Sequence, residues 1–137
     1  MLTVDAAGQR VGLTVSAVLS LSLEPPLVGV SVSRHAAIHE LLRDAGEFAL
    51  SLLAGDQEDV AQHFARGVPP FAHWHGVAVR HGSGPPLLDG ALGWVVCRLD
   101  GERAVGDHTF FVGAVASAER GRSAQPLLYL NQRYISL

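Results

Sequence analysis

The chain has 137 residues, of which 48% are hydrophobic, and a formal net charge of −3 at pH 7. This length and apolar content fit a single folded domain over residues 1–137 and exclude a disordered chain. No apolar run approaches the ~20 residues that span a bilayer, and no basic cluster suited to nucleic acid occurs, so we expect neither membrane nor nucleic acid as a partner. The single cysteine, Cys97, excludes an internal disulfide; we expect it in the core of a cytoplasmic protein.

The N-terminal part predicts strands. Residues 2–4 indicate a short strand, and residues 5–8 a turn. From Val11 to Leu23 the sequence alternates with period two: one parity is apolar, and the other carries glycine, threonine and serine, interrupted only by Val18. This predicts one long strand with an apolar face and a face of small hydroxyls. Because no charge occurs between Val11 and Glu24, the hydroxyl face suits a wall for a flat polar ligand; a strand face turned to water explains the pattern equally well.

The next segment predicts a strand that leads into a helix. Residues 27–33 have the composition of a strand. An apolar stripe at helical spacing follows, made of Ile38, Leu41, Leu42 and Ala45. Gly46 is placed to end this helix. His39 falls on the polar side, and we expect it in solvent.

The rest of the chain predicts more strands and one more short helix. Residues 47–53 indicate a strand, and Asp56 opens a helix that turns Val60, Ala61 and Phe64 inward. A loop-rich stretch over 67–86 surrounds a short strand at 76–80. Three further strands are expected at 92–99, 106–118 and 126–134. Six or seven strands with two short helices favour a small barrel, closed or partly open, over a parallel α/β sheet.

Two segments are candidates for binding chemistry. Where the strand 27–33 enters the helix, free N–H groups attract an anion, and Ser31, Ser33 and Arg34 would add hydroxyls and charge. Asp107 and His108 place a carboxylate and an imidazole at the start of a strand. The alternative for the first segment is an ordinary strand-to-helix turn, and the alternative for Asp107 and His108 is a surface turn.

Several kinds of site lack support in the sequence. His73 and His75 stand two residues apart without a nearby cysteine or carboxylate pair, so we expect no metal site. The glycine motif of dinucleotide-binding folds, the phosphate loop of NTPases and the serine-hydrolase elbow are absent from the sequence. If the protein is an enzyme, its reactive atoms therefore belong to a cofactor that the protein positions.

Six segments of the chain, taken in order, resemble one family. They are GLTVSAVLSLSLEPPL, VSVSRHAAIHELL, GEFALSLLAGDQEDVAQHFA, PLLDGALGWVVCRL, AVGDHTFFVGAV and PLLYLNQRY. Together they cover nearly the whole chain and resemble the flavin reductase-like family, the small components that supply reduced flavin to two-component monooxygenases. The resemblance implies a mainly β, FMN-binding split β-barrel of Greek-key type with two or three short helices. It also implies a homodimer that binds FMN or FAD and uses NADH or NADPH.

The resemblance further implies roles for individual residues. The segment against the flavin ring would be Val11, Gly12, Leu13, Thr14, Ser16 and Ala17. The segment that holds the phosphate would be Ser31, Val32, Ser33, Ala36 and Ala37. The second helix would contribute His63 and Phe64, and the nicotinamide side would have Asp107, His108 and Tyr134. No catalytic side chain is required beyond the cofactor.

Two features depart from the family pattern. Many relatives carry a hydroxyl or a basic residue where this chain has Ala36, Ala37 and Ile38, so the phosphate would depend on backbone N–H groups and Ser33. Relatives usually also begin with a helix, and we expect that this chain lacks it. Three interpretations follow: an NAD(P)H-dependent flavin reductase serving a partner monooxygenase, an FMN-binding protein without efficient NAD(P)H turnover, and a cofactor-free dimeric interaction module.

Overall fold

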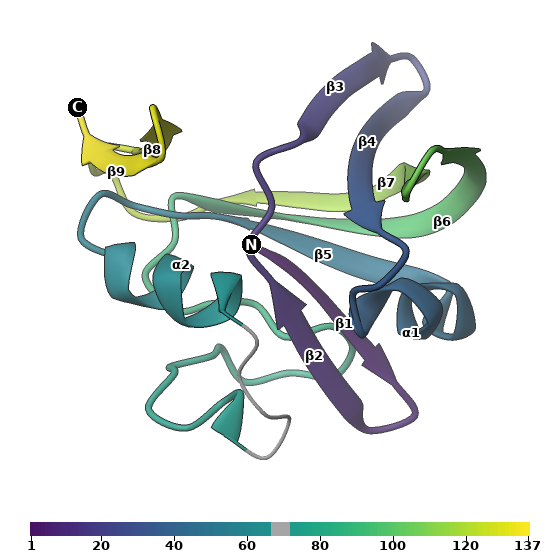
Figure 1. Ribbon diagram of the computed structural model, residues 1–137. Helices are drawn as coiled ribbons and strands as arrows, with labels where there is room; N and C mark the ends of the chain where they lie inside the picture. The colour runs from purple at the N-terminus through teal and green to yellow at the C-terminus, as the bar shows by residue number, and fades with distance from the viewer. Residues whose placement is uncertain (67–71) are drawn as a thin grey trace.

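The computed structural model describes residues 1–66 and 72–137, which form a mainly β fold (Figure 1). In chain order the elements are β1 Leu2–Ala6, β2 Gln9–Leu13, β3 Val18–Leu23, β4 Pro26–Ser33, α1 Ile38–Ala45, β5 Glu47–Leu52, α2 Glu58–Ala65, β6 Gly93–Val105, β7 His108–Arg120, β8 Leu127–Leu130 and β9 Arg133–Ser136. Seven strands form one antiparallel sheet in the order β2-β1-β5-β6-β7-β4-β3, and β8 pairs with β9 in a separate hairpin. The predicted mainly β class with short helices is confirmed.

A short linker makes this sheet curl into a split barrel. The edge strands β2 and β3 stand at opposite ends of the sheet, yet only residues 14–17 separate them in sequence. The five Cα–Cα steps from Leu13 to Val18 span at most about 18 Å, so the two edges must approach each other. At one end of the linker, Thr14 N–H donates to the carbonyl of Phe64 at 3.4 Å. At the other end, the Ala17 carbonyl accepts from Ser31 N–H at 3.1 Å.

The prediction of one continuous strand over residues 11–23 is therefore wrong. The chain leaves the ladder with β1 after Leu13 and joins β4 on the opposite edge at Val18. The apolar face predicted for this strand is also not buried along its length: Leu19, Leu21 and Leu23 are 55%, 43% and 89% exposed. The alternation continues through the break because both flanking segments are strands, so period alone does not reveal the change of edge.

Helix α1 buries one face against the sheet, and its apolar stripe predicted such a face. It packs against β1, β5 and β2, with Ile38 and Leu42 buried. Gly46 adopts a left-handed conformation (φ 64°) and donates its N–H to the Leu42 carbonyl, which ends the helix. Cys97 lies in the same core, where burial raises the pKa of its thiol to about 11.

His39 is buried, contrary to the expectation that it faces solvent. The residue is 2% exposed, and its Nε2 lies 2.7 Å from Thr109 Oγ1 on β7. The other ring nitrogen lies 2.8 Å from Glu40 Oε1, and the ring packs against Phe111. The position tolerates an imidazole because both polar atoms of the ring have partners.

Three other expected elements differ from the structure. Helix α2 begins at Glu58 with Gln57 at the cap position, rather than at Asp56. The expected strand at 76–80 is reduced to a single bridge between Val79 and Leu88. The expected strand at 126–134 is the β8–β9 hairpin, whose turn residues Asn131 and Gln132 have φ values of 51° and 60°.

Residues 67–71 of the expected loop lie outside the described residues. Across the described part of the chain, no helix is long and apolar enough to cross a bilayer.

Candidate functional site

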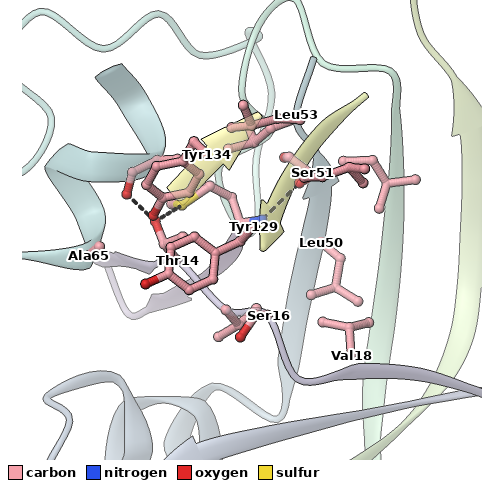
Figure 2. Close-up of a pocket in the computed structure, with 15 residues that line it drawn as sticks. Thr14, Ser16, Val18, Leu50, Ser51, Leu53, Ala65, Tyr129 and Tyr134 are labelled. Atoms are coloured by element: carbon pink, nitrogen blue, oxygen red, sulfur yellow. Dashed lines mark hydrogen bonds between the residues drawn. The ribbon is translucent and has the colours of Figure 1, made fainter. Parts of the chain in front are cut away.

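A cavity of about 510 Å³ opens between the linker 14–17, α2, β5 and the C-terminal hairpin (Figure 2). Its volume falls in the range of small-molecule sites. Apolar side chains form much of its wall, including Val18, Leu50 and Leu53. Among its lining residues, five carry hydroxyl groups: Thr14, Ser16, Ser51, Tyr129 and Tyr134. An apolar wall with a few hydroxyls suits a flat ring system with polar edges.

Some of these hydroxyls already have partners. Thr14 Oγ1 donates to the Ala61 carbonyl at 2.7 Å, and Ser51 Oγ accepts from Leu88 N–H at 3.1 Å. Ser16 is exposed, and among the described residues its hydroxyl has no hydrogen-bond partner. Within the same residues, the backbone N–H groups of Val15, Ser16 and Ala17 also make no hydrogen bond. The linker therefore offers free donors at the edge of the cavity.

Two tyrosines of the hairpin form the opposite part of the lining. Tyr129 and Tyr134 are paired across β8 and β9, with ring centroids 5.0 Å apart. Burial, together with Tyr129 and Glu58, raises the pKa of Tyr134, so its phenol stays protonated at neutral pH and can donate. The family resemblance implied a role for Tyr134 on the nicotinamide side, whereas nothing in the sequence singled out Tyr129. A turn assigned at Asn131 and Gln132 would have placed the two tyrosines opposite each other.

The predicted phosphate segment and the Asp107–His108 turn lie side by side. Ser33 on β4 pairs with His108 on β7, and Arg34 N–H donates to the Asp107 carbonyl at 2.9 Å. His108 Nδ1 lies 2.8 Å from Asp107 Oδ1. This hydrogen bond and the charge of the imidazole lower the pKa of the Asp107 carboxyl.

The entry into α1 is shaped mainly by backbone groups. Ala36 N–H donates to the Ser33 carbonyl at 3.0 Å, and Ser33 Oγ accepts from His35 N–H at 3.3 Å. Ala37 occupies the cap position without a side-chain hydrogen bond. Any anion bound here would be held by N–H groups of the first helical turn and by the Ser33 hydroxyl.

The structure separates some residues that the sequence grouped together. Tyr134 lies on the β8–β9 hairpin, and His108 begins β7 beyond the β6–β7 turn; Figure 1 shows these two parts of the molecule well apart. The cavity lining includes Tyr134 but neither Asp107 nor His108. Within one chain, the predicted nicotinamide-side residues therefore do not share a cavity.

Several residues predicted to contact flavin belong to the core. Val11, Leu13 and Val32 pack in the main apolar cluster. Gly12 is covered by α2, since a Cβ there would lie 2.9 Å from Phe64 Cε1. Phe64 itself is 2% exposed. These residues support the linker from behind, whereas Thr14 and Ser16 face the cavity.

His63 and Phe64 join an aromatic cluster under α2 that also contains His73 and Trp74. His63 Nε2 lies 2.8 Å from the carbonyl of His73. Burial, and secondarily the charge of His63, lowers the pKa of His73 and keeps that ring neutral at pH 7. Among the residues that the structure describes, no group of three or more His, Cys, Asp or Glu side chains is arranged to hold a metal ion.

Comparison with known proteins identifies the family. Residues 1–137 match the family model described as flavin reductase like domain. The reductase component of 4-hydroxyphenylacetate 3-monooxygenase from Thermus thermophilus is 42% identical over 123 residues, which cover 90% of this chain and 76% of the relative. The NADH-dependent FAD reductase of Streptomyces globisporus is 34% identical over 141 residues, covering 98% and 75%. The crystal structure of BorF, the flavin reductase component of a bacterial two-component tryptophan halogenase, superimposes with a TM-score of 0.88 at 34% identity, covering 99% of this chain and 88% of BorF. The chain, a split barrel like these reductases, belongs to the flavin reductase-like domain family.

Proposed function

We propose that the protein is an NAD(P)H-dependent flavin reductase that supplies reduced flavin to a partner monooxygenase. In such a reaction, the dihydronicotinamide would give up a hydride from C4 and the flavin, when bound, would accept it, which gives NAD(P)⁺ and reduced flavin. The observation that carries the proposal is the cavity between the linker 14–17 and the tyrosine hairpin, in a chain whose relatives include NADH-dependent flavin reductases.

The residues of this cavity fit a flavin. When bound, the isoalloxazine ring supplies the electron-accepting chemistry, which no side chain of the protein can provide. The linker would contact the ring through Thr14, Ser16 and Ala17, and its free N–H groups would donate to the polar ring edge. Ser31, Ser33 and the N–H group of Ala37 would hold the phosphate end, beside Ala36, whose own N–H is engaged by the Ser33 carbonyl.

The work of the protein is then positional and electrostatic. Holding two flat rings face to face at about 3–3.5 Å removes most of the entropic cost of the encounter. Donors fixed at the flavin edge stabilise the negative charge that develops on reduction. The protonated phenol of Tyr134 and the linker N–H groups are among the donors at the cavity.

Homodimer formation is part of the proposal. The outer strand β3 exposes Leu19, Leu21 and Leu23 beside an unpaired strand edge, and such a surface favours association. A second copy also explains how Tyr134 and His108, which are apart in one chain, can serve one site.

We expect Leu21→Glu to convert a dimer to a monomer in sedimentation. At low NAD(P)H, where a raised KM reduces the rate, mixing the His108→Ala and Tyr134→Phe variants would partly restore activity if the two residues act across the interface; no restoration would place them in separate roles.

An anaerobic titration tests the function. Purified protein is mixed with FMN or FAD, and NADH or NADPH is added while the visible absorbance of oxidised flavin is followed against a protein-free control. We expect rapid bleaching, and the four combinations rank the two flavins and the two donors. Flavin binding without bleaching would instead support the electron-transfer flavoprotein. A protein unaffected by either flavin would support the interaction module.

A cytoplasmic location, consistent with the free thiol of Cys97, completes the proposal.

A further inference from the structure

A second cavity of about 550 Å³ lies between α2 and the β8–β9 hairpin. It shares Tyr129, Tyr134 and Ala65 with the first cavity, so the two are direct neighbours. The rest of its lining is polar or charged: Glu58, Gln62, Arg66, Gln132 and Arg133. A ligand whose ring occupies the first cavity can therefore continue past the two tyrosines into a polar compartment.

The charges of this second cavity are unequally distributed. Arg66 donates to Gln62 Oε1 at 3.3 Å, and among the described residues neither Arg66 nor Arg133 has a carboxylate within ion-pair distance. The carboxylate of Glu58 accepts from Gln62 Nε2 at 2.7 Å. Glu58 begins α2, eight residues before Arg66, or about 12 Å along the helix axis. The Arg66 end of the cavity is thus the positive end.

We propose that the second cavity binds the pyrophosphate of a dinucleotide whose redox ring lies in the first cavity; this inference rests on the proposed function. Guanidinium groups bind phosphate oxygens with paired, charge-assisted hydrogen bonds. Two arginines without carboxylate partners therefore match the pyrophosphate of NAD(P)H, and the same group occurs in FAD. NAD(P)H is the expected source, because the phosphate end of the flavin is assigned to Ser33 and the α1 turn.

The test compares Arg66→Gln and Arg133→Gln with a matched control, Arg98→Gln, an exposed arginine of β6 that lines neither cavity. With FMN as acceptor, we expect each cavity variant to raise KM for NADH by roughly tenfold, the scale of one lost charged hydrogen bond, at nearly unchanged kcat. The KM for 1-benzyl-1,4-dihydronicotinamide, which has the ring but no phosphate, should not change. If the cavity variants, assayed with the phosphate-free donor, show a higher KM for FAD but not for FMN, the pyrophosphate bound in the second cavity is that of FAD.

A binding measurement separates this inference from the proposed function. ADP-ribose contains the pyrophosphate without nicotinamide, and calorimetry should show that it binds the wild-type protein and Arg98→Gln more tightly than either cavity variant. If the wild type reduces no flavin yet binds ADP-ribose in this arginine-dependent way, the proposed function fails and the cavity assignment stands. Equal ADP-ribose affinity in all proteins, or equal increases in KM for NADH and the phosphate-free donor, would overturn the assignment.

Discussion

The buried hydrogen bond between His39 and Thr109 allows a quantitative prediction. The two residues are 2% and 1% exposed, and the His39 Nε2–Thr109 Oγ1 distance is 2.7 Å. Thr109→Val keeps the shape of the side chain but leaves a ring nitrogen of His39 without a partner. An unsatisfied buried polar group costs about 1–3 kcal/mol, and no cavity is created. We therefore expect the free energy of unfolding to fall by about 1–3 kcal/mol.

Urea denaturation at a fixed protein concentration measures this loss, since association would otherwise shift the apparent stability. The matched background is His39→Leu, in which Thr109 has already lost its ring partner. In that background, Thr109→Val should be neutral or stabilising, because with both partners replaced neither polar group of the pair is left buried without a hydrogen bond. The coupling energy of the double-mutant cycle should be about 1 kcal/mol or more. An equal effect of Thr109→Val in both backgrounds would refute the role of the hydrogen bond.

Three further predictions concern the site and the core. His108→Ala should raise KM for NAD(P)H much more than it weakens flavin binding measured by fluorescence; equal losses would contradict a nicotinamide-side role. At neutral pH, the raised pKa of Cys97, about 11 against an ordinary 9.0, leaves about a hundredfold less thiolate, so alkylation should be slow until urea unfolds the protein. Gly113→Ala should lower the free energy of unfolding by about 1–3 kcal/mol, because the new Cβ would press on Phe48 and lie 2.8 Å from Cys97 Cβ; urea denaturation of this variant checks the value.

Local patterns were enough to predict the elements whose structure depends on neighbouring residues. The spacing of Ile38 and Leu42, with Gly46 behind them, predicts both the buried face of α1 and its end, and the structure agrees. The strand before it also matches, as β4 covers Pro26–Ser33. In both cases, side-chain period and a terminating residue carry the information, and these are visible within one short window.

Features that depend on distant contacts were not predictable in this way. His39 is separated by 70 residues from the hydroxyl that satisfies its ring, so its burial has no local signal. The hairpin turn at Asn131 and Gln132 is local but was missed for another reason: it lacks the glycine that usually marks two positive φ angles. The second cavity pairs Arg66 with Arg133 only because α2 and the hairpin meet in the folded chain.

The break at residues 14–17 connects the fold to the candidate site. In the continuous strand that the alternation predicted, ladder hydrogen bonds would have engaged backbone donors, leaving only a row of hydroxyls for a ligand. In the structure, the chain crosses from one sheet edge to the other, and among the described residues the N–H groups of Val15 and Ser16, two residues that line the cavity, remain free. The Thr14 hydroxyl, by contrast, is used to fasten the linker to α2. The split in the barrel thus supplies backbone donors at the segment where the sequence predicts the flavin ring, because the linker belongs to neither ladder.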